Sequence, residues 1–171
     1  MMKVLSLISV LALLAALAGC GGSGIEGRGP AACADSKELV AKARAGVDQI
    51  DIDEFNVLMD GDEYFTLIDV READEFDEGS IPGAINIPRG ILESSIANAK
   101  YWDSEGLFVP EKDEMMIVYG HKIDRGVLAA ETLVKLGYTN VRHLYGGWVV
   151  WTEGPDAVEV EEVVEEGGCG G

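Results

Sequence analysis

The segment from Tyr119 to Gly126, YGHKIDRG, gathers side chains whose types and spacing could bind or transform a substrate. It follows a short apolar run, MMIV, and precedes a run with helical periodicity, VLAAETLVKLG. A strand that leads through a tight loop into a helix often binds an anion, because backbone N–H groups and the helix dipole converge there. The candidate anion-binding residues are His121, Lys122, Ile123, Asp124, Arg125 and Gly126.

The surrounding sequence alternates short apolar segments with helical ones from Asp48 onward, a pattern typical of a parallel sheet covered by helices on both faces. Ser36 is the expected N-cap of a first helix that Gly46 terminates. Trp148 and Trp151 lie three residues apart on a helical turn and are expected to cap the core. The predicted strands are 65–70, 84–88, 115–119 and 140–144, and the other predicted helices are 53–61, 71–79, 90–102 and 125–137.

Two longer segments resemble the rhodanese-like domain family. The first is LIDVREADEFDEGSIPGAINIP (67–88), and the second, GYTNVRHLYGGWVVW (137–151), resembles the segment that closes such a domain. The resemblance covers residues 47–154 and implies a three-layer α/β/α fold with a central parallel sheet. It places the YGHKIDRG loop at the carboxyl end of the MMIVY strand, where ligands bind in open parallel sheets.

The family loop is usually Cys-x-x-Gly-x-Arg-Ser, and its thiolate accepts sulfur from a donor to form a persulfide. In this chain Gly120 stands at the cysteine position, Ile123 at the glycine and Gly126 at the serine, while Arg125 matches the arginine. Ser80 also stands where the family often has histidine. Glycine has no side-chain atom that could attack or carry sulfur, so the sequence predicts no catalytic residue.

The rest of the loop has two possible roles. It could bind sulfate, thiosulfate or phosphate without reacting, or Arg125 could pair with Asp69 or another acid in a structural remnant. Because a β-branched residue resists positive φ, Ile123 is expected to change the curled backbone that a glycine allows at that position. The resemblance implies that Asp69 and Arg71 brace the loop. A solvated helix face is expected for Asp74, Glu75, Asp77 and Glu78.

The N-terminus has the features of an export signal. Lys3 precedes an apolar run that ends in Leu-Ala-Gly-Cys, which resembles the lipobox of bacterial lipoproteins. We therefore expect a signal peptide at 1–19, lipidation of Cys20 and a periplasm-facing location in the bacterial cell envelope. The absence of aspartate after Cys20 favours the outer membrane. An ordinary secretory signal is the alternative.

The remaining segments are a tether and a tail. Residues 20–46 form a Gly-rich linker with a short helix, in which IEGR also matches a laboratory cleavage sequence, and residues 155–171 form an acidic, flexible tail. Cys33 and Cys169 could form a disulfide or remain free thiols. Neither cysteine has neighbours spaced as metal ligands, so no metal site and no cofactor are predicted.

The charge excludes nucleic acids as partners. Lys and Arg total 13 against 31 Asp and Glu, a formal net charge of -18 that repels polyanions. The leading hypothesis is a lipid-anchored, catalytically inactive rhodanese-like domain that binds a small oxyanion or an envelope protein. The alternative is a thiosulfate or persulfide sulfurtransferase that uses Cys169 or the thiol of a partner.

Overall fold

The computed structural model describes residues 33–158 of the chain. The predictions for the signal peptide, the acylated Cys20 and the Cys169 thiol lie outside these residues. Across the described range, no helix is both long and apolar enough to span a membrane.

The core of the described region is a sheet of five parallel strands in the order β1-β5-β4-β2-β3. This arrangement confirms the predicted α/β fold with a central parallel sheet. The four predicted strands are present, each slightly shorter than expected. The sequence analysis missed β1, an edge strand with only three residues, two of them exposed, which is too short to show a hydrophobic pattern. The bounds are β1 (Asp48–Ile50), β2 (Thr66–Asp69), β3 (Ile85–Asn86), β4 (Met116–Tyr119) and β5 (Val141–Leu144).

The helices largely follow the predicted segments, with two corrections. The N-cap of the first helix is Asp35, whose carboxylate accepts a hydrogen bond of 2.9 Å from the Glu38 N–H, and not Ser36 as predicted. The predicted helix 90–102 is broken into three pieces, because the Asn98 side chain caps a new helix by accepting from the Lys100 N–H. The bounds are α1 (Ser36–Ala45), α2 (Ile52–Asp60), α3 (Ala73–Asp77), η1 (Arg89–Ile91), α4 (Leu92–Ser95), α5 (Ala99–Ser104), α6 (Asp124–Lys135), α7 (Gly147–Glu153) and η2 (Pro155–Ala157).

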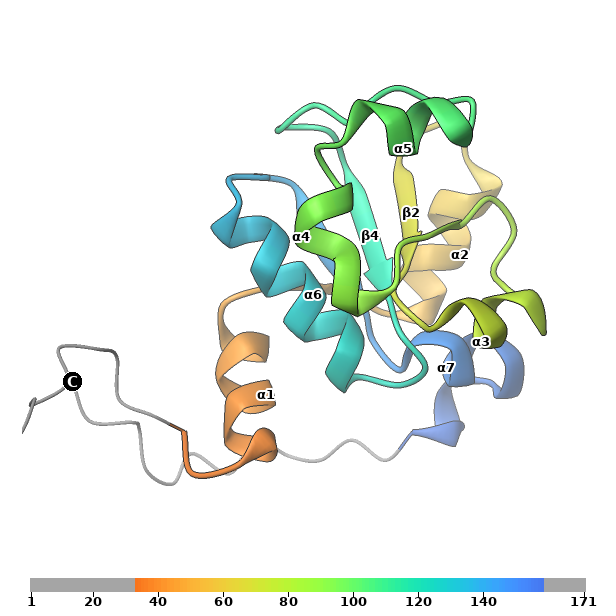
Figure 1. The fold of residues 1–171 in the computed structure, drawn as a ribbon. Helices are drawn as coiled ribbons and strands as arrows, with labels where there is room; N and C mark the ends of the chain where they lie inside the picture. The colour runs from red at the N-terminus through yellow and green to blue at the C-terminus, as the bar shows by residue number, and fades with distance from the viewer. Residues whose placement is uncertain (1–32, 159–171) are drawn as a thin grey trace, which may run out of the picture. The chain divides into compact units, whose positions relative to one another are not determined.

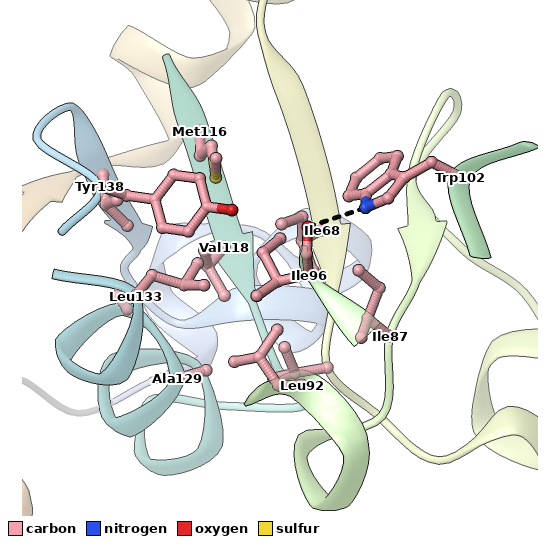
Figure 2. Packing of buried hydrophobic residues seen from close by; sticks show 13 residues of the cluster. Ile68, Ile87, Leu92, Ile96, Trp102, Met116, Val118, Ala129, Leu133 and Tyr138 are labelled. Carbon is pink, nitrogen blue, oxygen red and sulfur yellow. Dashed lines mark hydrogen bonds between the residues drawn. The ribbon is translucent and has the colours of Figure 1, made fainter. Parts of the chain in front are cut away.

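Two apolar clusters, one on each face of the sheet, produce the three layers (Figure 1). On one face α4, α5 and α6 pack against β2, β3 and β4, and Figure 2 shows Leu92, Trp102 and Leu133 converging there. The Trp102 indole N–H donates 2.9 Å to the Ile96 carbonyl, which satisfies its polar group inside the core. On the other face α2 and α7 supply Phe55 and Val150, and Trp148 and Trp151 pack at the margin of that cluster.

A few polar side chains are buried with this core. Among them, His143 on β5 stands out because its ring nitrogens make no hydrogen bonds within the described residues, 33–158. Only 1% of His143 is exposed. Burial and, to a smaller extent, the positive charge of Arg44 lower the pKa of His143, the backbone of Ile123 opposes both effects, and the resulting pKa is about 4. The imidazole is therefore neutral at physiological pH.

We predict that His143 makes the fold less stable in mild acid. Its pKa in the folded chain lies below its ordinary value of 6.5, so the unfolded chain binds the proton more tightly. The free energy of unfolding should fall by up to about 3 kcal/mol as the pH drops from 6.5 to about 4, and this histidine should cause no further loss below that.

Urea unfolding of wild type, His143→Leu and the matched control His121→Leu at several pH values measures this effect. The loss between pH 6.5 and 4 should shrink in His143→Leu and persist in His121→Leu, because His121 is exposed. Identical pH profiles for wild type and His143→Leu would show that the buried imidazole does not contribute.

Candidate functional site

The YGHKIDRG loop leaves the carboxyl end of β4 at Tyr119 and enters α6 at Asp124, one residue before the expected helix start. Its backbone is held by the first turn of α7. The N–H of Trp148 donates 2.9 Å to the Gly120 carbonyl, and the N–H of Val149 donates 3.0 Å to the His121 carbonyl. The amino end of α7 is therefore capped by the loop itself.

This close approach of α7 requires Gly147. Its φ is +55°, and a Cβ built on it would lie 2.3 Å from the Gly120 carbonyl oxygen and 2.7 Å from that of Lys122. Any side chain at this position would push the loop away from α7. The absence of a side chain at Gly147 therefore lets the loop carbonyls stay against α7.

Gly120 has little room for a side chain. A Cβ built on Gly120 would lie 3.0 Å from the Gly126 nitrogen and 3.1 Å from the Arg125 Cβ, closer than ordinary van der Waals contact. Any side chain at Gly120 would therefore press on the first turn of α6.

The loop backbone contains no left-handed residue at Gly120, Ile123 or Gly126. Ile123 has φ −84° and ψ −49°, an ordinary right-handed helical conformation, and its carbonyl accepts 3.1 Å from the Val127 N–H. Gly120 and Gly126 also lie outside the positive-φ region. Ile123 is therefore accommodated without strain, as the first turn of α6 is drawn toward β4.

The candidate anion ligand Arg125 is engaged by Glu75 of α3. Its two terminal nitrogens donate to the two carboxylate oxygens of Glu75 at 2.6 Å each, a bidentate pair. The hydrogen bonds from Arg125 lower the pKa of Glu75 to about 2, and the same bonds raise the pKa of Arg125. His121 is nearby, with Nδ1 4.0 Å from the same carboxylate. The expectation that Glu75 lies on a purely solvated face was wrong.

The position of Glu75 depends on a buried ion pair beneath α3. The Arg71 Nη2 lies 2.7 Å from Asp69 Oδ2, and both side chains are almost fully buried. Burial opposes the charge of Arg71, but the hydrogen bonds and charge of Asp69 outweigh it and raise the pKa of Arg71. Asp69 is thus paired with Arg71 and not with Arg125.

Arg71 also holds the α3 backbone. Its guanidinium donates 3.1 Å to the Glu75 carbonyl and 2.7 Å to the Gly79 carbonyl, and it stacks 4.4 Å from the centre of the Trp148 ring. A second constraint is the capping box of α3, in which the side chains of Glu72 and Glu75 each accept from the other's backbone N–H. Contacts therefore run from β2 through Arg71 and α3 to Arg125.

Part of the loop faces solvent. The side chains of His121, Lys122 and Asp124 are exposed, whereas Arg125 and Glu75 are each about one-third exposed, at 34% and 31%. The rim thus presents one lysine, one histidine and one aspartate beside a carboxylate–guanidinium pair whose charges cancel. Within residues 33–158, no three His, Cys, Asp or Glu side chains gather as they would around a metal ion.

His143 is the site residue that the sequence analysis missed. A Cβ on Gly126 would lie 2.9 Å from His143 Cδ2, so the imidazole packs directly beneath the loop at Gly126. A signal was present in the sequence, because a histidine in the apolar strand NVRHL is unusual at a buried position. The contact explains why position 126 is glycine.

Comparisons with known proteins agree with this geometry. The family model for the rhodanese-like domain matches residues 51–154. A mitochondrial protein of Schizosaccharomyces pombe, described as a candidate thiosulfate sulfurtransferase, is 34% identical over 95 residues, which are 54% of this chain and 67% of that protein. The human thiosulfate:glutathione sulfurtransferase is 35% identical over 91 residues, which are 51% of this chain and 78% of that enzyme.

A solved structure gives the same result. The human single-domain sulfurtransferase TSTD1 superposes with a TM-score of 0.59 at 28% identity, and the match covers 64% of this chain and 99% of that one. The described region thus combines the family's sheet order and loop position with sequence similarity to its sulfurtransferases. This chain belongs to the rhodanese-like domain family.

Proposed function

We propose that this chain is a rhodanese-like domain with no sulfurtransferase activity of its own, which acts as a protein-interaction module in the bacterial cell envelope. The observation that carries the proposal is Gly120. Sulfur transfer in this family requires an atom that attacks the donor and then holds the transferred sulfur. Gly120 offers none, and a Cβ at this position would already crowd the nitrogen of Gly126.

The Glu75–Arg125 pair favours a protein partner over a free oxyanion at this loop. A sulfate, thiosulfate or phosphate ion would have to displace a carboxylate that makes two hydrogen bonds of 2.6 Å and whose pKa is about 2. A protein partner need not break the pair, because the exposed His121 and Lys122 are available at the rim. An acidic side chain of the partner would complement them.

The envelope location follows from the expected lipidation of Cys20. Residues 21–35 would then connect the acylated cysteine to α1, which begins at Ser36. Attachment to a surface raises the local concentration of partners on the same membrane.

The alternative function is sulfur transfer through Cys169 or through the thiol of a partner protein. The similarity to the candidate yeast enzyme and to the human thiosulfate:glutathione sulfurtransferase supports this reading. Such reactions are fast only when the thiol is held in place beside the donor, and the described residues provide no thiol at the loop. We therefore place it second.

We predict background rates when the purified full chain is incubated with thiosulfate and cyanide. Formation of thiocyanate measures turnover, and Cys169→Ser is the matched control. The two proteins should be indistinguishable from a reaction without protein, because the loop has no nucleophile. Turnover in wild type that disappears in Cys169→Ser would establish the alternative function.

A second prediction concerns restoration of the nucleophile. Gly120→Cys alone should recover little thiocyanate formation, because its new Cβ would be 3.0 Å from the Gly126 nitrogen and must displace the loop. Adding Ile123→Gly to Gly120→Cys gives the backbone the freedom to curl around the sulfur and should raise the rate above that of the single variant. Near-normal turnover from Gly120→Cys alone would show that the anion cradle is already formed.

A third prediction tests whether the Glu75 carboxylate keeps anions from binding to Arg125. Glu75→Gln removes the charge but keeps the shape of the side chain, so thiosulfate should gain a binding event at the loop in calorimetry that wild type lacks. This gain should vanish in the double variant Glu75→Gln/Arg125→Ala. If wild type already binds thiosulfate and Arg125→Ala abolishes it, the loop is an anion site and Glu75 does not exclude ligands.

A further inference from the structure

A second polar cluster lies on the face of β5 that α1 and α6 cover. Residues two apart on a strand point to the same side, so His143 and Tyr145, which directly follows β5, share this face. Within the described part of the chain, both ring nitrogens of His143 and the hydroxyl of Tyr145 are buried without a hydrogen-bond partner. Buried polar atoms are rarely left unpaired, and an unexplained group calls for a water, an ion or a ligand.

A cation from α1 completes the cluster. The Arg44 guanidinium carbon lies 5.4 Å from the centre of the Tyr145 ring, and its charge acts on His143. No ion pair of Arg44 occurs among residues 33–158, whereas Arg71, Arg89, Arg125 and Arg142 each pair with a carboxylate. In a chain with a formal charge of -18, an arginine without a carboxylate partner in the described fold is unexpected.

Each of the three side chains carries a hydrogen-bond donor. Arginine supplies a planar set of N–H donors, tyrosine one O–H, and neutral histidine one ring N–H. Oxyanions accept several such hydrogen bonds at once, and a guanidinium recognises them in a bidentate manner. Arg44 is only partly buried, so a ligand could approach along it from solvent.

From this arrangement we propose that Arg44, His143 and Tyr145 form a binding site for a small oxyanion, separate from the loop and from Arg125. Inorganic phosphate is the probe that represents this chemistry. The site would also link ligand binding to the loop, because the His143 ring packs against Gly126. It requires α1, which precedes the matched family segment of 51–154.

The two histidines of the chain allow the two sites to be distinguished. His121 belongs to the loop, and His143 lies beneath β5, so the imidazole NMR signals report on each place separately. Phosphate added to the purified full chain should shift the signals of His143 and leave those of His121 unchanged. Shifts confined to His121, or shifts of neither histidine at millimolar phosphate, would overturn the proposal.

Three substitutions test the ligands by calorimetry with phosphate. Arg44→Ala should weaken binding by about tenfold or more, the typical effect of losing a charged hydrogen-bond donor. Tyr145→Phe removes only the hydroxyl and should weaken binding several-fold. Arg142→Ala is the matched control, because Arg142 lies on the same strand but pairs with Glu54, and it should have no effect. Unchanged affinity in both Arg44→Ala and Tyr145→Phe would exclude this site.

These outcomes are independent of the proposed function. Arg125→Ala should leave phosphate binding at His143 intact. Detection of sulfur transfer by the wild-type chain would not argue against phosphate binding at this site. Conversely, failure of phosphate to bind at Arg44 says nothing about sulfur transfer at Gly120.

Discussion

The carboxylate of Glu75 held against the guanidinium of Arg125 is the interaction on which the functional account depends. It joins α3 to the first turn of α6 and occupies the group that would otherwise attract an anion to the loop. The pair is only about two-thirds buried, so its net contribution to stability is expected to be small. The pair matters for function because it occupies the Arg125 guanidinium. A loop whose main cation is neutralised from within is better suited to contact a protein than to capture a free ion.

Three glycines of the site are explained by their neighbours. Gly147 allows the α7 N–H groups to reach the loop carbonyls, and Gly126 makes room for the buried His143 ring. Gly120 lies between them, with the Gly126 nitrogen against the position of a missing side chain. Any side chain at Gly120 would therefore press on this backbone. For that reason we expect that a single substitution at Gly120 would not give a reactive loop.

Much of the fold could be predicted from the sequence, because four apolar strands and their helices have lengths and boundaries that periodicity reveals. The edge strand β1 could not, since three residues with one buried side chain carry no pattern. The position of Arg125 in the first turn of α6 followed from loop spacing. The partner of Arg125 did not, because Glu75 lies 50 residues away and looks like one of several acids on a short helix. His143 escaped notice because its role comes from packing beneath the loop.

The most direct test of the central claim is intact-mass spectrometry of the purified full chain after treatment with a sulfane sulfur donor. If Gly120 has removed the covalent step, the mass should stay unchanged, as it should in the variant Cys169→Ser. A gain in mass equal to one sulfur atom on the wild-type chain would show that it forms a persulfide and would contradict the account.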